Sequence, residues 1–483
     1  MIRLLLVLIV ASFGSALAEG PKKKPNVLFI ALDDLRPELG CYGNPLIKSP
    51  NIDRLAKQGM ILTRAYCQQA VCSPSRTSLL TGARPDTTKV WDLSTHFRRA
   101  LPEVVTLPQH FKNAGYFTRA MGKIYHGSLD DRASWSVPTV QPKAGFGRPP
   151  QSKRPGATKA ELRGPAIGIE DVADNALHDG ELADMAVAAL GELKEKPEPF
   201  FLAVGFIRPH LPFIAPRKYW ELYEREKIPL APNPFRPKGA PAFALVRGAA
   251  ELRSYAGTPE GDVLPDAFAR ELKHGYYASV SYADAQVGRV LDELERLGLR
   301  ENTIIVLWGD HGWKLGEHAA WAKHSNVEND TRVPLIVSVP GMKQTGGKSD
   351  ALVELVDVYP TLAELAGLPL PAHLEGRSFQ PLLEEPARAW KTAAFSQYPR
   401  RTGKAGRMGY SMRTDRYRFT QWVNLKDRTK VQAIELYDHA NDPQENINLA
   451  HEPAQTAVIE TLKRQWAAGW QAEQARMGTP KSN

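Results

Sequence analysis

The chain has 483 residues, of which 43% are hydrophobic and 24% charged, a composition typical of an enzyme-sized protein with one large domain and a smaller one. Its 3 cysteines are too few for a disulfide framework, and no zinc-finger, basic-zipper or ribonucleoprotein pattern favours nucleic acid as a partner. The formal net charge of +9 indicates either steering of anionic polymers or a solvated basic surface.

Residues 1–18 have the pattern of a secretory signal peptide. Arg3 precedes an apolar run over residues 4–13, and Ala16-Leu17-Ala18 then forms a small-residue cleavage site. A membrane-spanning helix needs about 20 apolar residues, so this run is too short to cross a bilayer. Because no cysteine follows the cleavage site, we expect no lipid or membrane anchor. The pattern predicts export to a periplasm or to the exterior, or to the lysosome in a eukaryotic cell.

The first predicted strand is the continuous apolar run over residues 26–32, which is typical of a strand buried on both faces of a sheet. Asp33 and Asp34 follow it directly. Two adjacent carboxylates at the end of a buried strand repel each other, so this placement favours a metal cation between them. A solvated turn is the alternative.

A helix is predicted to begin next to Cys72, because Pro74 suits a first helical turn and Arg76 lies in the same turn. The start of such a helix aims free backbone N–H groups at the position of Cys72, which favours an anion there. From the residues alone, Cys72 is either a small buried hydrophobe or a reactive thiol whose pKa falls beside Arg76. Cys41 and Cys67 either pair or stay as two free buried thiols, and we expect the second.

Strands and helices then alternate along the chain. The alternation indicates an α/β fold with a large, mainly parallel sheet between helices, and a site at the carboxyl ends of the strands. Residues 136–168 and 214–265 are predicted to be long loops, the second a candidate for substrate contacts. The further strands are predicted at 116–121, 199–206, 303–308 and 334–339, and helices at 51–59, 107–113, 179–194, 271–297 and 356–365.

Polar residues follow several of these strands. His210 lies on a loop stiffened by two prolines, and is either a packed loop residue or a positioned one. Asp310 and His311 end the strand over 303–308 as Asp33 and Asp34 end the first strand, so the four could enclose a divalent cation, mostly through oxygen. Lys123 and His126, each of which taken alone is more often a surface residue, follow the strand over 116–121, and Lys323 supplies a further cation near the same edge.

The composition changes near residue 385, where short aromatic runs replace the long apolar strands. Runs at 395–398, 409–413, 417–423 and 433–437 predict an antiparallel sheet, closed by a helix from about 453 to 474. The expected organisation is therefore a signal peptide (1–18), a large N-terminal domain (25–385) that carries the candidate site and would be the catalytic domain, and a smaller C-terminal α+β subdomain (386–483).

The segment 71–82 contains Cys-x-Pro-x-Arg followed by Thr-Ser-Leu-Leu-Thr-Gly, and it closely resembles the signature of type I sulfatases of the alkaline phosphatase superfamily. Segments 33–43, 68–76, 310–318, 321–323 and 397–400 are similar to the iduronate-2-sulfatase group of that family. His311 supports this narrower resemblance, since many other sulfatases have Asn at that place. The loops at 127–176 and 214–265 match poorly.

The resemblance implies an exported hydrolase that removes sulfate, in particular the 2-O-sulfate of a terminal uronic (iduronic) acid, from a sulfated oligosaccharide or polysaccharide. It implies that Cys72 is oxidised to formylglycine by a formylglycine-generating or anaerobic sulfatase-maturating enzyme, and that Arg76 supports the product. It also implies a Ca²⁺ held by Asp33, Asp34, Asp310, His311 and the modified Cys72, with Lys123, His126, His210 and Lys323 around the sulfate.

Three alternatives remain open beside this interpretation. One is a sulfatase for another sulfated polysaccharide or a small sulfate ester. Another is a phosphatase or phosphodiesterase of the same superfold, whose nucleophile would be an unmodified residue, usually Ser or Thr. The third is a binder of sulfated glycan that has lost turnover.

Overall fold

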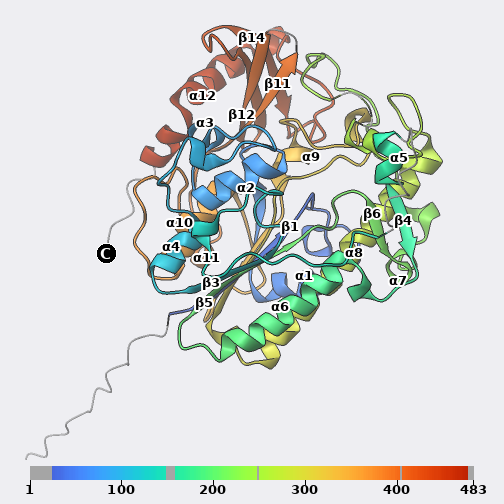
Figure 1. Ribbon diagram of the computed structural model, residues 1–483. Helices are drawn as coiled ribbons and strands as arrows, with labels where there is room; N and C mark the ends of the chain where they lie inside the picture. Colours follow the sequence, from blue (N-terminus) through green and yellow to red (C-terminus); the bar gives the residue numbers. More distant parts are fainter. Residues whose placement is uncertain (1–23, 148–157, 247, 249, 403–404, 477–483) are drawn as a thin grey trace, which may run out of the picture.

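An eight-stranded sheet crosses the molecule, and β1, β3 and β5 are labelled in Figure 1. Its strand order is β10-β2-β9-β7-β1-β5-β3, with β8 paired to β2. The structure is a computed structural model that describes residues 24–147, 158–246, 248, 250–402 and 405–476. The predicted signal peptide lies outside the described residues. The strands are β1 (Asn26–Leu32), β2 (Met60–Tyr66), β3 (Phe117–Gly122), β5 (Phe200–Phe206), β7 (Thr303–Gly309), β8 (Arg332–Val333), β9 (Leu335–Ser338) and β10 (Gly347–Glu354).

The sheet is mainly parallel, as the sequence predicts. The central strand β1 pairs in parallel with β5 and with β7, and β3 continues the parallel order beyond β5. All residues of β1, β5 and β7 are buried, which explains their continuous apolar sequence. The strand predicted at 334–339 is β9, and it runs antiparallel to both β7 and β2.

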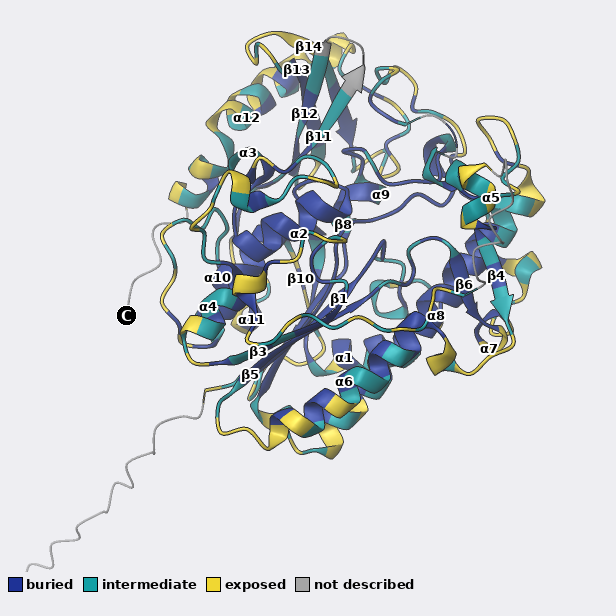
Figure 2. Ribbon diagram, in the orientation of Figure 1, coloured by how far each residue is buried: buried dark blue, intermediate teal, exposed yellow. Residues whose placement is uncertain are grey.

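Helices cover both faces of this sheet, and β1 contributes alternate side chains to the two cores. Leu28 and Ile30 belong to one buried cluster, whereas Val27 and Phe29 belong to the other. Figure 2 shows the buried strands between helices, of which α4 and α6 have exposed outer parts, whereas α2 is buried throughout. The first cluster includes α1 (Pro50–Gln58), α6 (His178–Lys194) and α8 (Asp266–Arg296); the second includes α2 (Cys72–Thr81), α4 (Leu107–Asn113), α10 (Val358–Leu365) and α11 (Gln380–Glu384).

Local signals account for the helix ends. The α4 helix begins at a capping box between Thr106 and Gln109. The α2 helix ends at Gly82, whose φ of 67° lies in the left-handed region that favours glycine. The short α3 (Pro85–Thr88) follows α2.

Among the described residues, no helix combines the length and apolar character that crossing a bilayer requires.

The two regions predicted to be long loops contain short elements, so that prediction is partly wrong. The first holds α5 (Lys159–Arg163), which begins at a capping box formed by Thr158 and Glu161, and the start of β4 (Ile167–Glu170). The second holds the end of β6 (Phe213–Pro216), which pairs in parallel with β4, and α7 (Arg217–Trp220). These elements are too short for a hydrophobic period to reveal them.

The predicted antiparallel sheet is present near the C-terminus and packs against a long helix. Its order is β11-β12-β13-β14, and α12 supplies Ile459 and Leu462 to the same apolar cluster. The β11 strand also meets the segment before α2, because Gln397 N donates to Gln68 O at 2.7 Å. The elements are β11 (Ala393–Thr402), β12 (Ala405–Thr414), β13 (Tyr417–Asn424), β14 (Val431–Asp438), α12 (Thr456–Arg476) and, earlier in the chain, α9 (Glu328–Thr331).

Candidate active site at the carboxyl ends of the central strands

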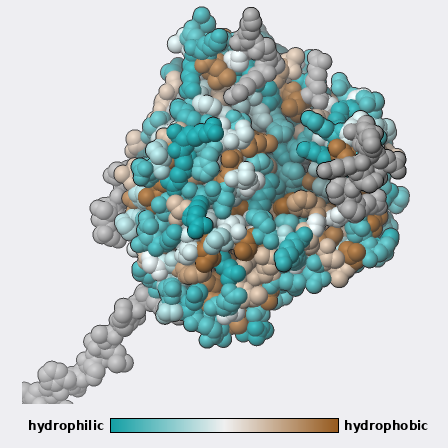
Figure 3. All heavy atoms as spheres, in the orientation of Figure 1, coloured by the Kyte–Doolittle hydropathy of each residue, from teal (hydrophilic) through white to brown (hydrophobic). Residues whose placement is uncertain are grey.

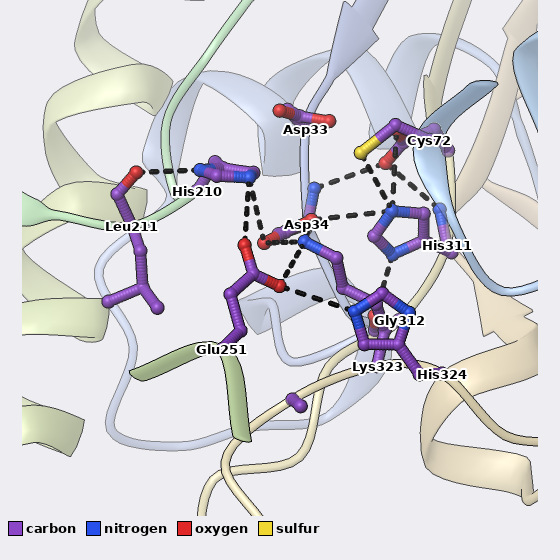
Figure 4. A network of polar contacts seen from close by, with 12 residues as sticks. Asp33, Asp34, Cys72, His210, Leu211, Glu251, His311, Gly312, Lys323 and His324 are labelled. Carbon is purple, nitrogen blue, oxygen red and sulfur yellow. Dashed lines mark hydrogen bonds and ion pairs between the residues drawn. The ribbon is translucent and has the colours of Figure 1, made fainter. Parts of the chain in front are cut away.

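The polar residues predicted from the sequence gather at one edge of the large sheet, where four parallel strands end. Parallel strands bring their carboxyl ends to the same edge, so residues far apart in the chain meet there. Figure 4 shows many of these side chains turned toward one another. Asp33 and Asp34 follow β1, Lys123 and His126 follow β3, His210 follows β5, Asp310 and His311 follow β7, and Cys72 and Arg76 come from the start of α2.

Arg76 joins the ends of two strands. Its Nη2 donates to Asp33 Oδ1 at 3.1 Å, and its Nε donates to Asp310 Oδ2 at 2.8 Å. A further contact reaches Ile124 O at 3.2 Å, after β3. All three charged side chains are fully buried, so each guanidinium bond is formed away from water and fixes the carboxylates firmly. Arg76 therefore fixes the positions of two carboxylates of the site, Asp33 and Asp310.

Cys72 is buried at the start of α2, and its Sγ lies 3.3 Å from His311 Nε2 and 3.6 Å from Lys123 Nζ. Burial raises the pKa of the thiol well above its usual value, and the charge of Asp33 adds to this, although Lys123 opposes it. The hypothesis of a thiol whose pKa falls beside Arg76 is therefore wrong, because burial outweighs the effect of the nearby cations. Arg76 itself pairs with two carboxylates. Cys41 and Cys67 are free, as expected, but Cys41 is only half-buried.

Two overlapping groups of side chains could hold a metal ion. One consists of Asp33, Cys72, Asp310 and His311, and in it one ligand atom of each residue lies within 4.8 Å of the others. The Nδ1 of His311 lies 2.9 Å from Gly312 O, which assigns the proton to Nδ1 and leaves the Nε2 lone pair toward the cluster. The other group replaces Asp310 and His311 by Asp34 and His210.

The charges of this cluster fit a hard cation. Burial raises the pKa of Asp34 to about 7, and the charges of Asp33 and Glu251 contribute to the rise against the opposing effect of Lys323. Burial also opposes ionisation of Asp33, but Lys123, His210 and Arg76 outweigh it and hold the pKa of Asp33 well below its usual value. Oxygen ligands concentrated in this way suit Ca²⁺ or a similar ion.

The backbone at Asp34 is strained. Its φ of 61° lies in the left-handed region, which a non-glycine residue adopts only at a cost in energy. Two contacts hold it there: Asp34 N donates to Asp310 Oδ1 at 3.1 Å, and Tyr276 Oη donates to Asp34 O at 3.0 Å. The strain turns adjacent carboxylates, Asp33 and Asp34, toward the same cluster.

Lys323 and His210 are two basic residues whose side chains face the carboxylate of Asp34. Lys323 follows the short 3-10 helix at Glu317–Ala319, and its Nζ donates to the two carboxylate oxygens of Asp34 at 3.0 and 3.1 Å. The Nδ1 of His210 lies 2.6 Å from Leu211 O, which leaves Nε2 facing Asp34 Oδ2 at 3.8 Å. Burial lowers the pKa of His210 to about 4, and the charge of Lys323 lowers it further.

His126 is the predicted site residue with the fewest contacts. Its Nδ1 is buried without a hydrogen-bond partner. Burial lowers the pKa of the imidazole to about 4, and the charge of Lys123 contributes to the decrease. The side chain is therefore neutral at neutral pH and able to accept a proton.

Sequence reasoning missed Glu251 and the role of His324. Glu251 lies in the 3-10 helix at Ala250–Ser254, and its carboxylate contacts Lys323, His210 and His324. It comes from the region 214–265, which was predicted to be a loop that contacts the substrate. That prediction was the only indication in the sequence that Glu251 could lie near the site. Nothing in the sequence placed His324 against Glu251.

The hollow face of the molecule is largely hydrophilic. Figure 3 shows a depression between the C-terminal sheet at the top and the region around α5 at the right, with hydrophilic side chains in it. Such a surface suits a polar or charged ligand better than an apolar one.

The sequence matches the family profile described as Sulfatase over residues 25–368, and the profile described as N-sulphoglucosamine sulphohydrolase, C-terminal, over residues 316–471. It is 37% identical to iduronate 2-sulfatase of Mus musculus over 514 aligned residues, which cover 91% of this chain and 93% of that protein.

Two solved structures share the fold of this chain. The phosphonate monoester hydrolase of Agrobacterium radiobacter superposes with a TM-score of 0.75 at 23% identity, covering 93% of this chain and 95% of that chain. A 2-O GAG sulfatase superposes with a TM-score of 0.73 at 24% identity, covering 95% of each chain. At identities of 23% and 24%, these two similarities show that the fold is shared and are not evidence for a shared activity.

Proposed function

This chain belongs to the sulfatase family and is a sulfuric ester hydrolase, and from that premise we propose that it removes the 2-O-sulfate of a terminal uronic acid, in particular iduronic acid, from a sulfated glycan. The observation that carries the proposal is the 37% identity to iduronate 2-sulfatase over 91% of the chain. The cationic side chains around Cys72 support it, because a sulfate ester is anionic.

We propose that Asp33, Asp34, Asp310 and His311 hold a Ca²⁺ together with Cys72 converted to formylglycine. The support is that Asp33, Asp310 and His311 belong to one of the two groups described above and Asp33 and Asp34 to the other, with Cys72 in both, and that Nε2 of His311 faces the cluster. When present, the ion would offset negative charge on the sulfate, and the hydrated aldehyde would supply an attacking hydroxyl and a second hydroxyl through which sulfate is released. The conversion requires a maturating enzyme as a partner.

The residues of this chain have three tasks in the proposed reaction. Lys123 lies 3.6 Å from Cys72 Sγ, where its ammonium can pair with a sulfate oxygen. Lys323 or His210 protonates the sugar oxygen as it leaves. Lys323 fits this role better, because burial keeps the His210 imidazole neutral at neutral pH, whereas the carboxylates of Asp34 and Glu251 outweigh burial and raise the pKa of Lys323. His126 is the base that accepts a proton when sulfate is released, because burial keeps its imidazole neutral.

A substrate panel tests the proposal. Inorganic sulfate release is measured from oligosaccharides that end in a 2-sulfated uronic acid, and from glycans sulfated elsewhere, with protein whose modification at residue 72 is known from mass spectrometry. We expect turnover of the first class, and loss of it in Cys72→Ala. Turnover of a different sulfate linkage alone would reject the 2-O assignment, and turnover of phosphate esters by the unmodified thiol would favour the phosphatase alternative.

We also propose that residues 1–18 direct export and are removed. The support is the pattern of Arg3, the apolar run and Ala16-Leu17-Ala18. N-terminal sequencing of the protein recovered from its native host should begin at Glu19. A mature chain that retains Met1 would contradict this assignment.

A further inference from the structure

We propose that Glu251 is a positioning residue of the reaction, which holds Lys323 and His210 in place beside the leaving sugar oxygen. This inference rests on the proposed function, in which one of those two residues donates the proton. Because Glu251 contacts both, the inference holds whichever of them is the donor.

The carboxylate of Glu251 lies at the centre of three basic side chains (Figure 4). Its Oε2 is 2.9 Å from Lys323 Nζ and 3.5 Å from His324 Nε2, and its Oε1 is 3.4 Å from His210 Nε2. Lys323 is almost fully buried, so its ammonium depends on such partners for its orientation. Asp34 is its other carboxylate partner and is a proposed metal ligand. A bound metal ion would compete for Asp34 and leave Glu251 as the dedicated partner.

Glu251 is itself held by the C-terminal sheet. His324 Nδ1 lies 2.7 Å from the Oη of Tyr398 on β11, which fixes the imidazole while Nε2 faces Glu251. The guanidinium of Arg400 donates to His324 O at 2.5 Å and so fixes the backbone of the same residue. Two successive supports therefore connect β11 to Lys323 and His210.

The segment that carries Glu251 is anchored below the site. Leu252 is buried in the apolar cluster that includes α8, and Thr258 Oγ1 donates to Leu252 O at 3.0 Å. These contacts fix the start of the Glu251 side chain, as a positioning role requires. Direct contact with the substrate is unfavourable, because a carboxylate would repel a sulfate ester. Glu251 must then act through the cations that it contacts.

The test compares two sulfate esters that differ in their leaving group. A sugar alcohol needs a proton as it leaves, whereas 4-nitrophenol leaves as a stable anion and gains little from an acid. Steady-state kcat and KM are measured for a 2-sulfated uronate oligosaccharide and for 4-nitrophenyl sulfate, using protein with the same extent of modification at Cys72. If the wild-type enzyme prefers another sugar sulfate, that sugar takes the place of the uronate.

We expect Glu251→Gln to lower kcat on the sugar sulfate by about 100-fold, the lower end of the range for proton transfer, and to change kcat on 4-nitrophenyl sulfate far less. Glu251→Asp should recover part of the loss, and Tyr398→Phe should give a smaller loss with the same selectivity. The matched control is Glu328→Gln, because Glu328 has a similar side-chain exposure (16% against 19%) and pairs with Arg413 away from the site. It should leave both substrates unaffected.

Equal losses on both substrates in Glu251→Gln, or no loss on either, would overturn the inference while the wild-type enzyme remains a sulfatase. Retained activity on 4-nitrophenyl sulfate shows at the same time that the variant is folded. A correctly modified wild-type enzyme that hydrolyses no sugar sulfate would overturn the proposed function, and this inference with it.

Discussion

Arg76 donates a hydrogen bond of 2.8 Å to Asp310 although the two residues are 234 positions apart in the chain, and both side chains are fully buried. The same guanidinium reaches Asp33. One side chain thus pairs with the carboxylate that follows β1 and with the carboxylate that follows β7, and orients both at the site.

Removal of Arg76 should destabilise the protein strongly. We expect Arg76→Ala to lower the free energy of unfolding by about 3–5 kcal/mol, because it leaves two carboxylates buried without their partner. Urea unfolding measures the change. Arg54→Ala is the control: Arg54 pairs with the exposed Asp292, and a surface pair contributes about 0–1 kcal/mol. A loss as small as the control's would show that Asp33 and Asp310 do not depend on Arg76.

Calcium should stabilise the protein through the carboxylates after β1 and β7. A ligand that binds only the folded state at 100 times its Kd adds about 2.7 kcal/mol to the free energy of unfolding. The melting temperature should rise with Ca²⁺ and fall with a chelator, and Asp34→Asn should reduce the response. Asp415→Asn, at an exposed residue, is the control. An equal response in Asp34→Asn and the wild type would place the ion elsewhere.

The stability should depend on pH through Glu317, which pairs with Arg36 at 2.9 Å. Burial opposes ionisation of Glu317, but Arg36 and Lys273 outweigh it and lower its pKa to about 2, from the usual 4.5. A depressed folded pKa gives stability that is fully present above pH 4.5 and is lost as the pH falls toward 2. Since one pKa unit corresponds to about 1.4 kcal/mol, the contribution is on the order of 3 kcal/mol.

Comparison with Glu317→Gln isolates this contribution. The variant should be less stable than the wild type at pH 7, and the difference should shrink as the pH falls from about 5 to about 2, where the wild-type carboxyl gains its proton. Chemical unfolding at a series of pH values provides the measurement. A difference that stays constant over this range would mean that Glu317 does not titrate in the expected window.

Cys72→Ser should separate the first half of the proposed reaction from the second. A serine offers one hydroxyl, so it can accept a sulfo group but has no second hydroxyl through which to expel it. We expect at most one leaving group released per site and a sulfate ester at residue 72, visible by mass spectrometry. Cys67→Ser, at another buried cysteine, should keep full turnover. Repeated turnover by an unmodified serine at residue 72 would reject the need for an aldehyde.

The strands that carry the site could be predicted because they are buried on both faces. The runs that became β1, β5 and β7 are continuously apolar, and the charged residues at their ends could be grouped because parallel strands share an edge. The edge strand β10 was not predicted: half of its residues are only partly buried or exposed, so polar residues interrupt its pattern. The antiparallel direction of β9 could not be predicted either, because it depends on pairing with β2 and β7, which are distant in the sequence.

The placement of Glu251 shows a different limit. Its segment has no period and no recognised turn signal, and its path depends on Leu252 and on contacts with residues far away in the chain. Such a path is set by tertiary packing, which a local pattern does not contain. Lys123, His126 and His210 could be proposed as site residues because each follows a strand.

The burial of Cys72 limits the stage at which this residue can be modified. Only 2% of this residue is exposed in the folded chain. If its thiol is to be oxidised, a second protein must handle the segment as an extended strand, before the first helical turn closes over it. The modification would then have to take place before the chain completes folding. A chain that folds first would keep an inaccessible, unmodified thiol at residue 72 and would be inactive.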